Sequence, residues 1–146
     1  MQIVLATHNK GKMSEINNLL SSFYEVLTLD HFPNIKEIPE TGKTLKENAF
    51  IKARTVFEMT GLPSLADDTG LEVESLGGDP GVYSARYAGE QASYQDNCEK
   101  LLKNMMRVPK KDREAKFRTV IAYKDDNREL FCDGSVKGEI VPAPKG

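Results

Sequence analysis

A change in hydrophobic spacing near the N-terminus is the feature that most restricts the fold. Residues 2–6 (QIVLA) form a short continuous apolar run, which is typical of a buried β-strand. Residues 12–22 then carry apolar side chains at helical spacing, and residues 24–29 (YEVLTL) return to a strand pattern. Strand, helix and strand in this order make a β-α-β unit, so the sequence predicts an α/β fold.

A second helix is predicted from residue 45 to about residue 60. Thr44 and Glu47 form a capping-box pattern at its start, and Gly61 marks its end. The preceding residues, 30–43, carry two prolines and a glycine and are predicted to form a loop.

The second half of the chain follows a different pattern. Residues 71–76 (LEVESL) are expected to add a short strand, and Ser93 is expected to cap a third helix. From Glu114 to Val141, two strand-like segments are joined by Asp125-Asp126-Asn127, which indicates an antiparallel hairpin. Together with the parallel start, this hairpin predicts a mixed sheet in one domain of 146 residues.

The first candidate binding site is the loop after the first strand, Thr7-His8-Asn9-Lys10-Gly11-Lys12. Backbone N–H groups at a helix N-terminus favour an anion, and the loop adds a hydroxyl, an amide and two lysines. It is not a P-loop, because Ala6 and Met13 stand where that motif needs Gly and Ser or Thr. Phosphate binding is one interpretation, and an ordinary solvated loop with Asn9 as the helix cap is the other.

The second candidate site is a pair of adjacent aspartates, Asp67 and Asp68. They are predicted to end a third strand at residues 63–67, the region where open α/β sheets place ligands. Mg²⁺ is usually held by one or two carboxylates together with phosphate oxygens, so either aspartate is a candidate ligand. Side chains alternate along a strand, so one of the two should face the site, and position alone does not say which. The alternative is an Asp-rich turn before Gly70.

Other charged residues are weaker candidates. Glu40, in the loop PETG, is either a second metal ligand or a surface glutamate. Lys52, in the middle of the predicted helix, is either solvated or placed to reach a phosphate. Glu47 already has a role at the helix cap, so a catalytic role is less favoured there. His8 and His31 are too few and too far apart in the sequence to indicate a zinc site.

Charge and cysteine content argue against several kinds of partner. The net charge of −2 provides no overall basic field to attract nucleic acid. The only two cysteines, Cys98 and Cys132, and the lack of a signal-peptide pattern indicate a reduced, cytoplasmic protein. The apolar run at the N-terminus is too short for a membrane span. We therefore expect neither a nucleic acid nor a membrane as a partner.

In combination, these segments resemble one known family. A Thr-x-Asn-x-x-Lys loop is followed by ETGKTLKENAFIKA and then by LADDTGLEVESLGGDPGVYSARYAG. This order is similar to that of the inosine/xanthosine triphosphate pyrophosphatases, the Ham1-like group, over residues 1–146. The resemblance implies an α/β fold with a mixed, bent sheet, flanking helices and a cleft between two lobes.

The resemblance also implies a function and a set of site residues. The family hydrolyses non-standard purine nucleoside triphosphates (ITP, dITP and XTP) to the monophosphate and pyrophosphate, uses Mg²⁺, and works as a cytoplasmic homodimer. Asp68 is implied as the catalytic proton acceptor and, with Glu40, as a metal ligand. The implied substrate contacts are Thr7, His8, Asn9, Lys10, Gly11, Lys12, Lys52 and Thr69.

The sequence differs from the family at its C-terminus. The family continues with a Gly-Phe-Gly-Tyr-Asp-Pro segment and a Ser-His-Arg segment that recognise the base, and this sequence contains neither. We therefore expect a single incomplete domain that hydrolyses ITP poorly and discriminates weakly between ITP and ATP. We also expect reduced solubility or altered assembly, because the strands within 115–141 lose the elements that cover them.

Two other functions are alternatives. A Maf-like nucleotide pyrophosphatase carries a Ser-x-Ser-Pro-Arg-Arg loop after the first strand, where this chain has THNKGK. A non-catalytic nucleotide-binding or oligomerisation module would keep the fold without turnover. Binding of Mg²⁺ and ITP without release of pyrophosphate would favour the module.

Overall fold

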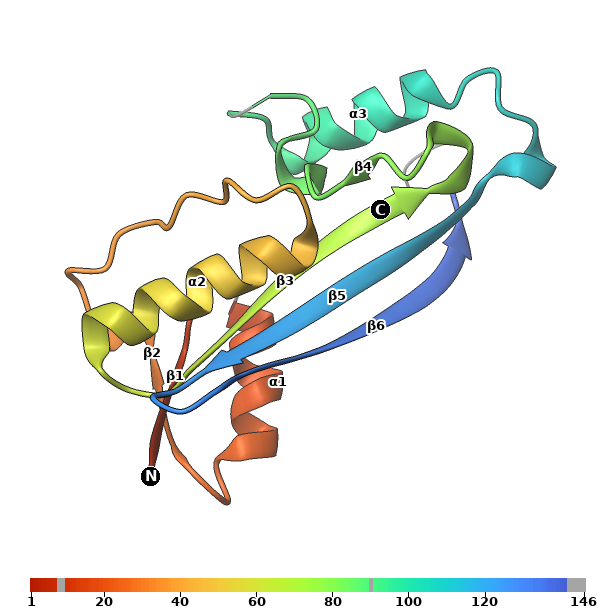
Figure 1. Ribbon diagram of the computed structural model, residues 1–146. Helices are drawn as coiled ribbons and strands as arrows, with labels where there is room; N and C mark the ends of the chain where they lie inside the picture. Colours follow the sequence, from red (N-terminus) through yellow and green to blue (C-terminus); the bar gives the residue numbers. More distant parts are fainter. Residues whose placement is uncertain (8–9, 90, 142–146) are drawn as a thin grey trace. The chain divides into compact units, whose positions relative to one another are not determined.

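A computed structural model describes residues 1–7, 10–89 and 91–141 of the chain. Its six-stranded sheet has the order β2-β1-β3-β5-β6, with β4 paired to β3 (Figure 1). The strands are β1 (Gln2–Leu5), β2 (Glu25–Thr28), β3 (Ser64–Val73), β4 (Pro80–Gly81), β5 (Glu114–Lys124) and β6 (Glu129–Glu139). The α-helices are α1 (Lys10–Leu20), α2 (Leu45–Thr60) and α3 (Tyr94–Asn104). The predicted α/β fold with a mixed sheet is confirmed.

The parallel and the antiparallel parts of the sheet both occur in the segments for which the sequence predicted them. β1 lies between β2 and β3 and runs parallel to each, so the predicted β-α-β unit is present. β5 and β6 run in opposite directions and form the predicted hairpin (Figure 1). Its turn is held by Asp125, whose Oδ1 accepts from the backbone N–H groups of Asn127 and Arg128 at 2.8 and 2.9 Å.

The described residues form two compact units. Unit 1 contains Met1–Asp68 and Val120–Cys132, and unit 2 contains Thr69–Thr119 and the residues from Asp133 onward. Unit 1 therefore includes β1, β2, α1 and α2, together with the first half of β3. The expectation of a single domain stays a prediction.

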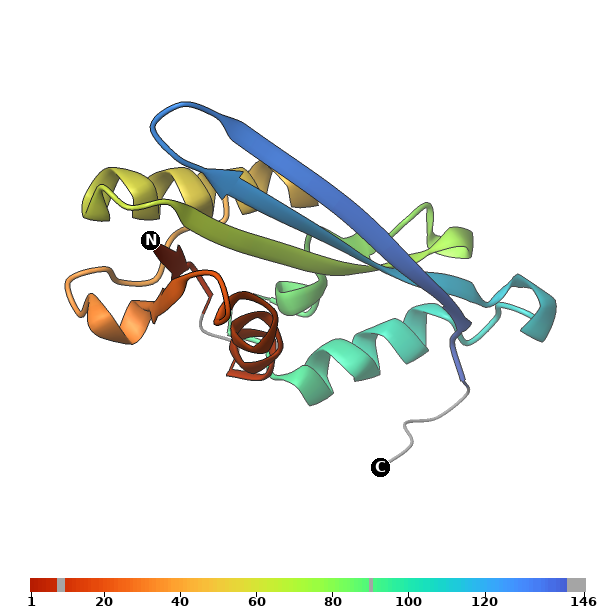
Figure 2. The same cartoon turned by 90° about the horizontal axis from the view of Figure 1, so that it is seen from below.

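The core of unit 1 explains how α2 approaches the sheet. Ala49, Ala53 and Val56 of α2 are fully buried, as is Val4 of β1. Ala49 and Ala53 are one helical turn apart, and their small side chains allow a close approach of the helix backbone. In unit 1, α1 and α2 lie on opposite faces of the sheet (Figures 1 and 2).

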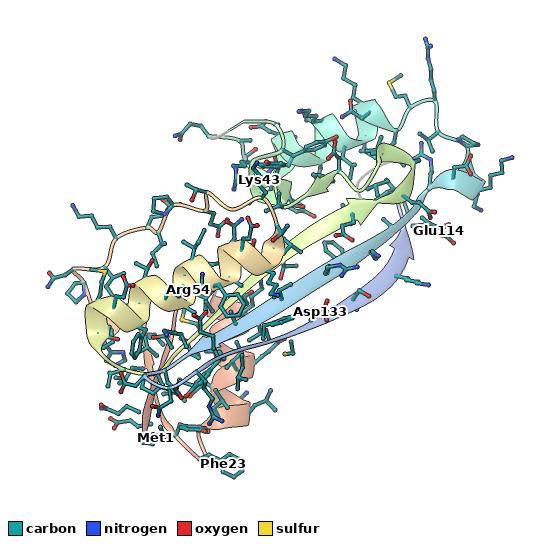
Figure 3. All side chains as sticks on the ribbon, in the orientation of Figure 1. Met1, Phe23, Lys43, Arg54, Glu114 and Asp133 are labelled. Atoms are coloured by element: carbon teal, nitrogen blue, oxygen red, sulfur yellow. The ribbon has the colours of Figure 1, made fainter. Side chains whose placement is uncertain are left out.

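The predicted start and end of α2 are confirmed. The Thr44 hydroxyl accepts from the Glu47 N–H at 3.1 Å. The Glu47 carboxylate accepts from the Lys43 N–H at 2.6 Å, one residue before the expected capping-box partner. Gly61 ends the helix in the left-handed conformation, with φ of 70°. Figure 3 labels Lys43 next to the N-terminus of α2.

An ion pair links α2 to the hairpin within unit 1. The Arg54 guanidinium lies 2.6 Å from the carboxylate of Glu129, the first residue of β6. Figure 3 shows Arg54 projecting from α2. An edge ring contact between Phe50 and Phe131, with 6.1 Å between ring centroids, adds to this link.

Three boundaries differ from the sequence predictions. α1 begins at Lys10 instead of residue 12, so the last residues of the candidate loop form its first turn. β3 does not end at the aspartates, and it continues without a break through Asp68 to Val73. Residues 74–76 form a short 3₁₀ helix instead of completing a separate strand. Asp and Gly disfavour strands locally, and here the tertiary partners of the aspartates outweigh that preference.

Unit 2 has its own small core. Ser93 caps α3 as predicted, and its hydroxyl accepts from the Asp96 N–H at 3.1 Å. Val73 and Met105 are fully buried in this core, and Ala115 packs with them as a largely buried residue. None of the helices in the described part of the chain has an apolar stretch long enough to cross a bilayer.

Candidate functional site

The candidate loop and the aspartate pair meet at the carboxyl end of β1. The last paired residue of β1, Leu5, lies opposite Leu65 of β3. Beyond that pair the chain leaves the sheet at Thr7, whereas β3 continues through Asp67 and Asp68. The two carboxylates therefore lie on the part of β3 that extends beyond the end of β1. Open α/β sheets bind ligands at the carboxyl ends of their strands. All of these residues belong to unit 1.

Each aspartate of the pair has its own surroundings. Only 4% of Asp67 and 9% of Asp68 is exposed. Adjacent side chains of a strand point to opposite faces, so the two carboxylates face different helices. Asp67 forms an ion pair with Lys12 of α1, and Asp68 lies near Lys52 of α2. Asp68 is the one on the α2 side, and which of the two faces a ligand stays a prediction.

Lys12 occupies an unusual place for a lysine, because it is in the first turn of α1. The N-terminus of a helix carries a partial positive charge, which disfavours a cation there. The buried Asp67 carboxylate compensates that charge through a contact between residues 55 positions apart in the sequence. Lys12 is thereby anchored at the end of the candidate phosphate-binding loop.

The acidity of Asp68 is strongly altered. Burial raises its pKa to about 6, and the nearby Glu40 carboxylate adds to the rise, as does Asp67 to a smaller extent. Lys52 and the Asn48 amide oppose the rise. The Asn48 amide interacts with the Asp68 carboxylate, and the Asn48 Nδ2 and the Asp68 Oδ2 each lack a hydrogen-bond partner. A carboxyl group that titrates close to neutral pH is suited to proton transfer.

Glu40 and Lys52 are brought together by the loop that precedes α2. The Lys52 Nζ lies 3.1 Å from the Glu40 Oε1, and 16% of the Lys52 side chain is exposed. Lys52 is therefore not the solvated helix lysine of the alternative interpretation. Glu40 and Lys52 both act on Asp68, so these three side chains form one charged cluster.

Sequence analysis missed two residues that support this cluster. Asn48 is fully buried, and its Oδ1 accepts from the Gly42 N–H at 2.7 Å. A Cβ on Gly42 would lie 2.6 Å from the Glu47 Cβ and 2.7 Å from the Asn48 Oδ1, so only glycine fits there. A polar residue on the apolar face of a predicted helix, one turn before Lys52, is the signal that could have identified Asn48.

The structure leaves several predicted contacts as predictions. His8 and Asn9 lie outside the described residues. Lys10 and Gly11 are the first two residues of α1. Thr69 belongs to unit 2, where its hydroxyl shares a hydrogen bond of 2.8 Å with Thr119.

The carboxylates fit a divalent cation that is shared with a ligand. Within residues 1–7, 10–89 and 91–141, no group of three or more His, Cys, Asp or Glu side chains is arranged to hold a metal alone. Glu40 and Asp68 supply two carboxylates, and the buried Asp68 Oδ2 has no hydrogen-bond partner in the structure. Two carboxylates completed by phosphate oxygens and water are the usual environment of Mg²⁺.

The raised pKa of Asp68 predicts a pH-dependent stability. The folded protein binds this proton more tightly than the unfolded chain, whose aspartates have a pKa near 3.8. The stabilising contribution is present below about pH 4 and is lost as the pH rises through about 6. In the presence of a chelator, we expect the melting temperature of Asp68→Asn to exceed that of the wild type by an amount that grows from pH 4 to pH 7.5. A difference that is independent of pH would contradict the assigned pKa.

Comparison with known proteins assigns the family. The model of the Ham1 family matches residues 3–146. This chain belongs to the Ham1 family. The Ham1 assignment agrees with the resemblance found in the sequence and does not support the Maf-like alternative.

Curated relatives of this Ham1 chain carry one name. The chain is 50% identical to the dITP/XTP pyrophosphatase of Vibrio cholerae, over 99% of this chain and 74% of that protein. It is 46% identical to the dITP/XTP pyrophosphatase of Thermoanaerobacter pseudethanolicus, over 100% of this chain and 74% of that protein. The chain therefore spans about three quarters of the length of these relatives.

Solved Ham1 structures share the fold. The Ham1 protein of Staphylococcus aureus matches with a TM-score of 0.90 at 37% identity, over 100% of this chain and 75% of that one. A HAM1 protein from Coxiella burnetii matches with a TM-score of 0.91 at 40% identity, over 100% and 76% of the two chains.

Proposed function

We propose that this protein hydrolyses non-standard purine nucleoside triphosphates such as ITP, dITP and XTP to the monophosphate and pyrophosphate. Its membership of the Ham1 family and the names of its relatives support this reaction. The single structural observation that carries the proposal is the buried Asp68, surrounded by Glu40 and Lys52 at the carboxyl end of β1.

The proposed mechanism assigns a role to three charged side chains of unit 1, Lys12, Lys52 and Asp68. Lys12 and Lys52 bind phosphate oxygens, with additional N–H donors from the start of α1. Asp68 accepts a proton from the water whose oxygen attacks the α-phosphorus. The bond between the α-phosphorus and the bridging oxygen breaks, and pyrophosphate leaves with that electron pair. The contacts of Thr7, His8, Asn9 and Thr69 with the substrate are part of the same proposal.

The proposed cofactor is Mg²⁺. Glu40 and Asp68 are the side chains that would hold it. When bound, Mg²⁺ neutralises phosphate charge and lowers the pKa of coordinated water. Asp68 would then remain ionised in the working enzyme, because a nearby cation favours the charged form of a carboxyl group.

Release of pyrophosphate tests the reaction and the metal requirement together. We expect release from ITP, dITP and XTP with Mg²⁺, loss of release with excess EDTA, and recovery when Mg²⁺ is added in excess. Enzyme concentrations comparable with the substrate make slow turnover detectable. Calorimetry with Mg²⁺ and ITP in parallel distinguishes the enzyme from the binding module. Tight binding with no release under any of these conditions would reject the enzymatic function.

Two further properties belong to this proposal. We expect a homodimer that works in the cytoplasm, with a nucleotide as its partner and neither nucleic acid nor membrane. The family resemblance, the net charge of −2 and the few cysteines support these expectations. Sedimentation velocity of the purified protein tests the assembly state.

A further inference from the structure

A fully buried asparagine in α2 calls for an explanation. Asn48 has no exposed surface. It is a polar residue among apolar core residues, because its neighbours on the same helix face are Leu45 and Ala49. A buried polar group that lacks a partner costs about 1–3 kcal/mol. An asparagine is therefore expected at such a position only where both ends of its amide have a use.

The oxygen end of the Asn48 amide holds the loop that carries Glu40. Its Oδ1 accepts from the Gly42 N–H at 2.7 Å, two residues after Glu40. Gly42 approaches so closely that a Cβ there would lie 2.7 Å from the same oxygen. One helical turn later, Lys52 pairs with Glu40 itself at 3.1 Å. Two residues of one helix face thus fix the position of this loop.

The nitrogen end of the same amide is directed to the other carboxylate of the cluster. Among the described residues, the buried side-chain polar atoms that lack a hydrogen-bond partner are the Asn48 Nδ2 and the Asp68 Oδ2. One is a donor and the other an acceptor, and the Asn48 amide favours the ionised form of Asp68. The two atoms are therefore complementary, and the amide and the carboxylate that carry them lie close enough to interact.

We infer that Asn48 is a positioning residue that sets the distance between Glu40 and Asp68. Its oxygen fixes the Glu40 loop, and its nitrogen donates to the ionised Asp68 carboxylate in the working site. The inference rests on the proposed function for its effect on turnover. The contact between Asn48 and Asp68 does not depend on that function.

Nuclear magnetic resonance tests this contact without any activity measurement. The ¹H–¹⁵N signals of the Asn48 side-chain amide are assigned by their loss in Asn48→Asp. We expect them to shift in Asp68→Asn more than in Asp67→Asn, which removes the same charge one residue away on the opposite face. An equal or smaller shift in Asp68→Asn would overturn the inference, and this test does not require Asn48→Asp to be active.

Kinetics separates positioning from a purely structural role. Asn48→Asp keeps the oxygen that accepts from Gly42 and removes the donor that faces Asp68. We expect kcat for pyrophosphate release to fall about 10- to 100-fold, as for other residues that orient a ligand, with KM for ITP changed less than about threefold. An unchanged kcat in a folded Asn48→Asp would reject positioning.

A control variant tests whether replacing a hydrogen-bonded asparagine with aspartate lowers turnover at any position in the protein. Asn97→Asp makes the same replacement in α3 of unit 2, where both ends of the amide bind the backbone of Ala85 and Ala88. We expect its kcat to equal that of the wild type. If neither wild type nor Asn97→Asp releases pyrophosphate, the proposed function fails, and the resonance shifts still decide whether Asn48 contacts Asp68. Should Asn48→Asp fail to fold, Asn48→Ser replaces it in the kinetic test with the same expectation.

Discussion

Replacing Asp68 with asparagine is expected to reduce kcat for pyrophosphate release by about 10²- to 10⁴-fold. Asparagine has nearly the same shape as aspartate, but it cannot accept the proton of the attacking water. The side chain is buried beside Glu40, so the substitution also removes one of two repelling charges. The loss of turnover should therefore not come from unfolding. Measured kcat and KM for ITP, together with the melting temperature of the same sample, test both parts.

Asp67→Asn is the matched comparison for this experiment. It also removes a buried charge, next to Asp68 in the sequence, but its partner is Lys12. We expect it to act mainly through KM, because it loosens a lysine that binds phosphate. An Asp68→Asn protein with near wild-type turnover and intact ITP binding would show that another group accepts the proton.

Replacing Lys12 with methionine is expected to lower kcat/KM for ITP about 10- to 100-fold, because a charge-assisted hydrogen bond is worth about 1.5–3 kcal/mol. The same substitution leaves the Asp67 carboxylate buried without its cation. Removal of one partner of a fully buried ion pair costs about 3–5 kcal/mol. Because 34% of the Lys12 side chain is exposed to solvent, we expect a smaller loss of unfolding free energy, about 1–3 kcal/mol.

A double substitution separates the two effects of Lys12. In Lys12→Met with Asp67→Asn, no uncompensated charge remains, so we expect the unfolding free energy to return toward that of the wild type. Activity should stay low, since the phosphate contact is still missing. Chemical denaturation of the two single variants and the double variant gives the coupling energy. Additive effects on stability would mean that the ion pair contributes nothing to the fold.

Local sequence patterns were sufficient for much of the fold. The strand-helix-strand start followed from the spacing of apolar residues, and the ends of α2 followed from Thr44 and Gly61. The hairpin turn followed from Asp125 and its neighbours, whose hydrogen bonds lie within three residues of one another. Each of these features is decided by contacts between residues that are close in the sequence.

The partners of the site residues could not be predicted in the same way. The pairing of Lys12 with Asp67 joins residues 55 positions apart, and nothing near either residue in the sequence specifies it. The same pairing explains why β3 continues through two aspartates where local preference favours a turn. Asn48 escaped notice because helix periodicity identifies a buried face and does not report what a buried amide binds.

The pairing of Lys12 and Lys52 with carboxylates has a consequence for ligand choice. The charges of Lys12 and Lys52 are cancelled by Asp67 and Glu40, which leaves the surplus negative charge of an ionised Asp68. We therefore expect these five side chains by themselves to provide no net attraction for a bare polyphosphate. Glu40 and Asp68 are the side chains that would hold a cation bound with the nucleotide, and Lys52 would then be available to a phosphate oxygen. We therefore expect the resting protein to bind a nucleotide more weakly without its cation than with it.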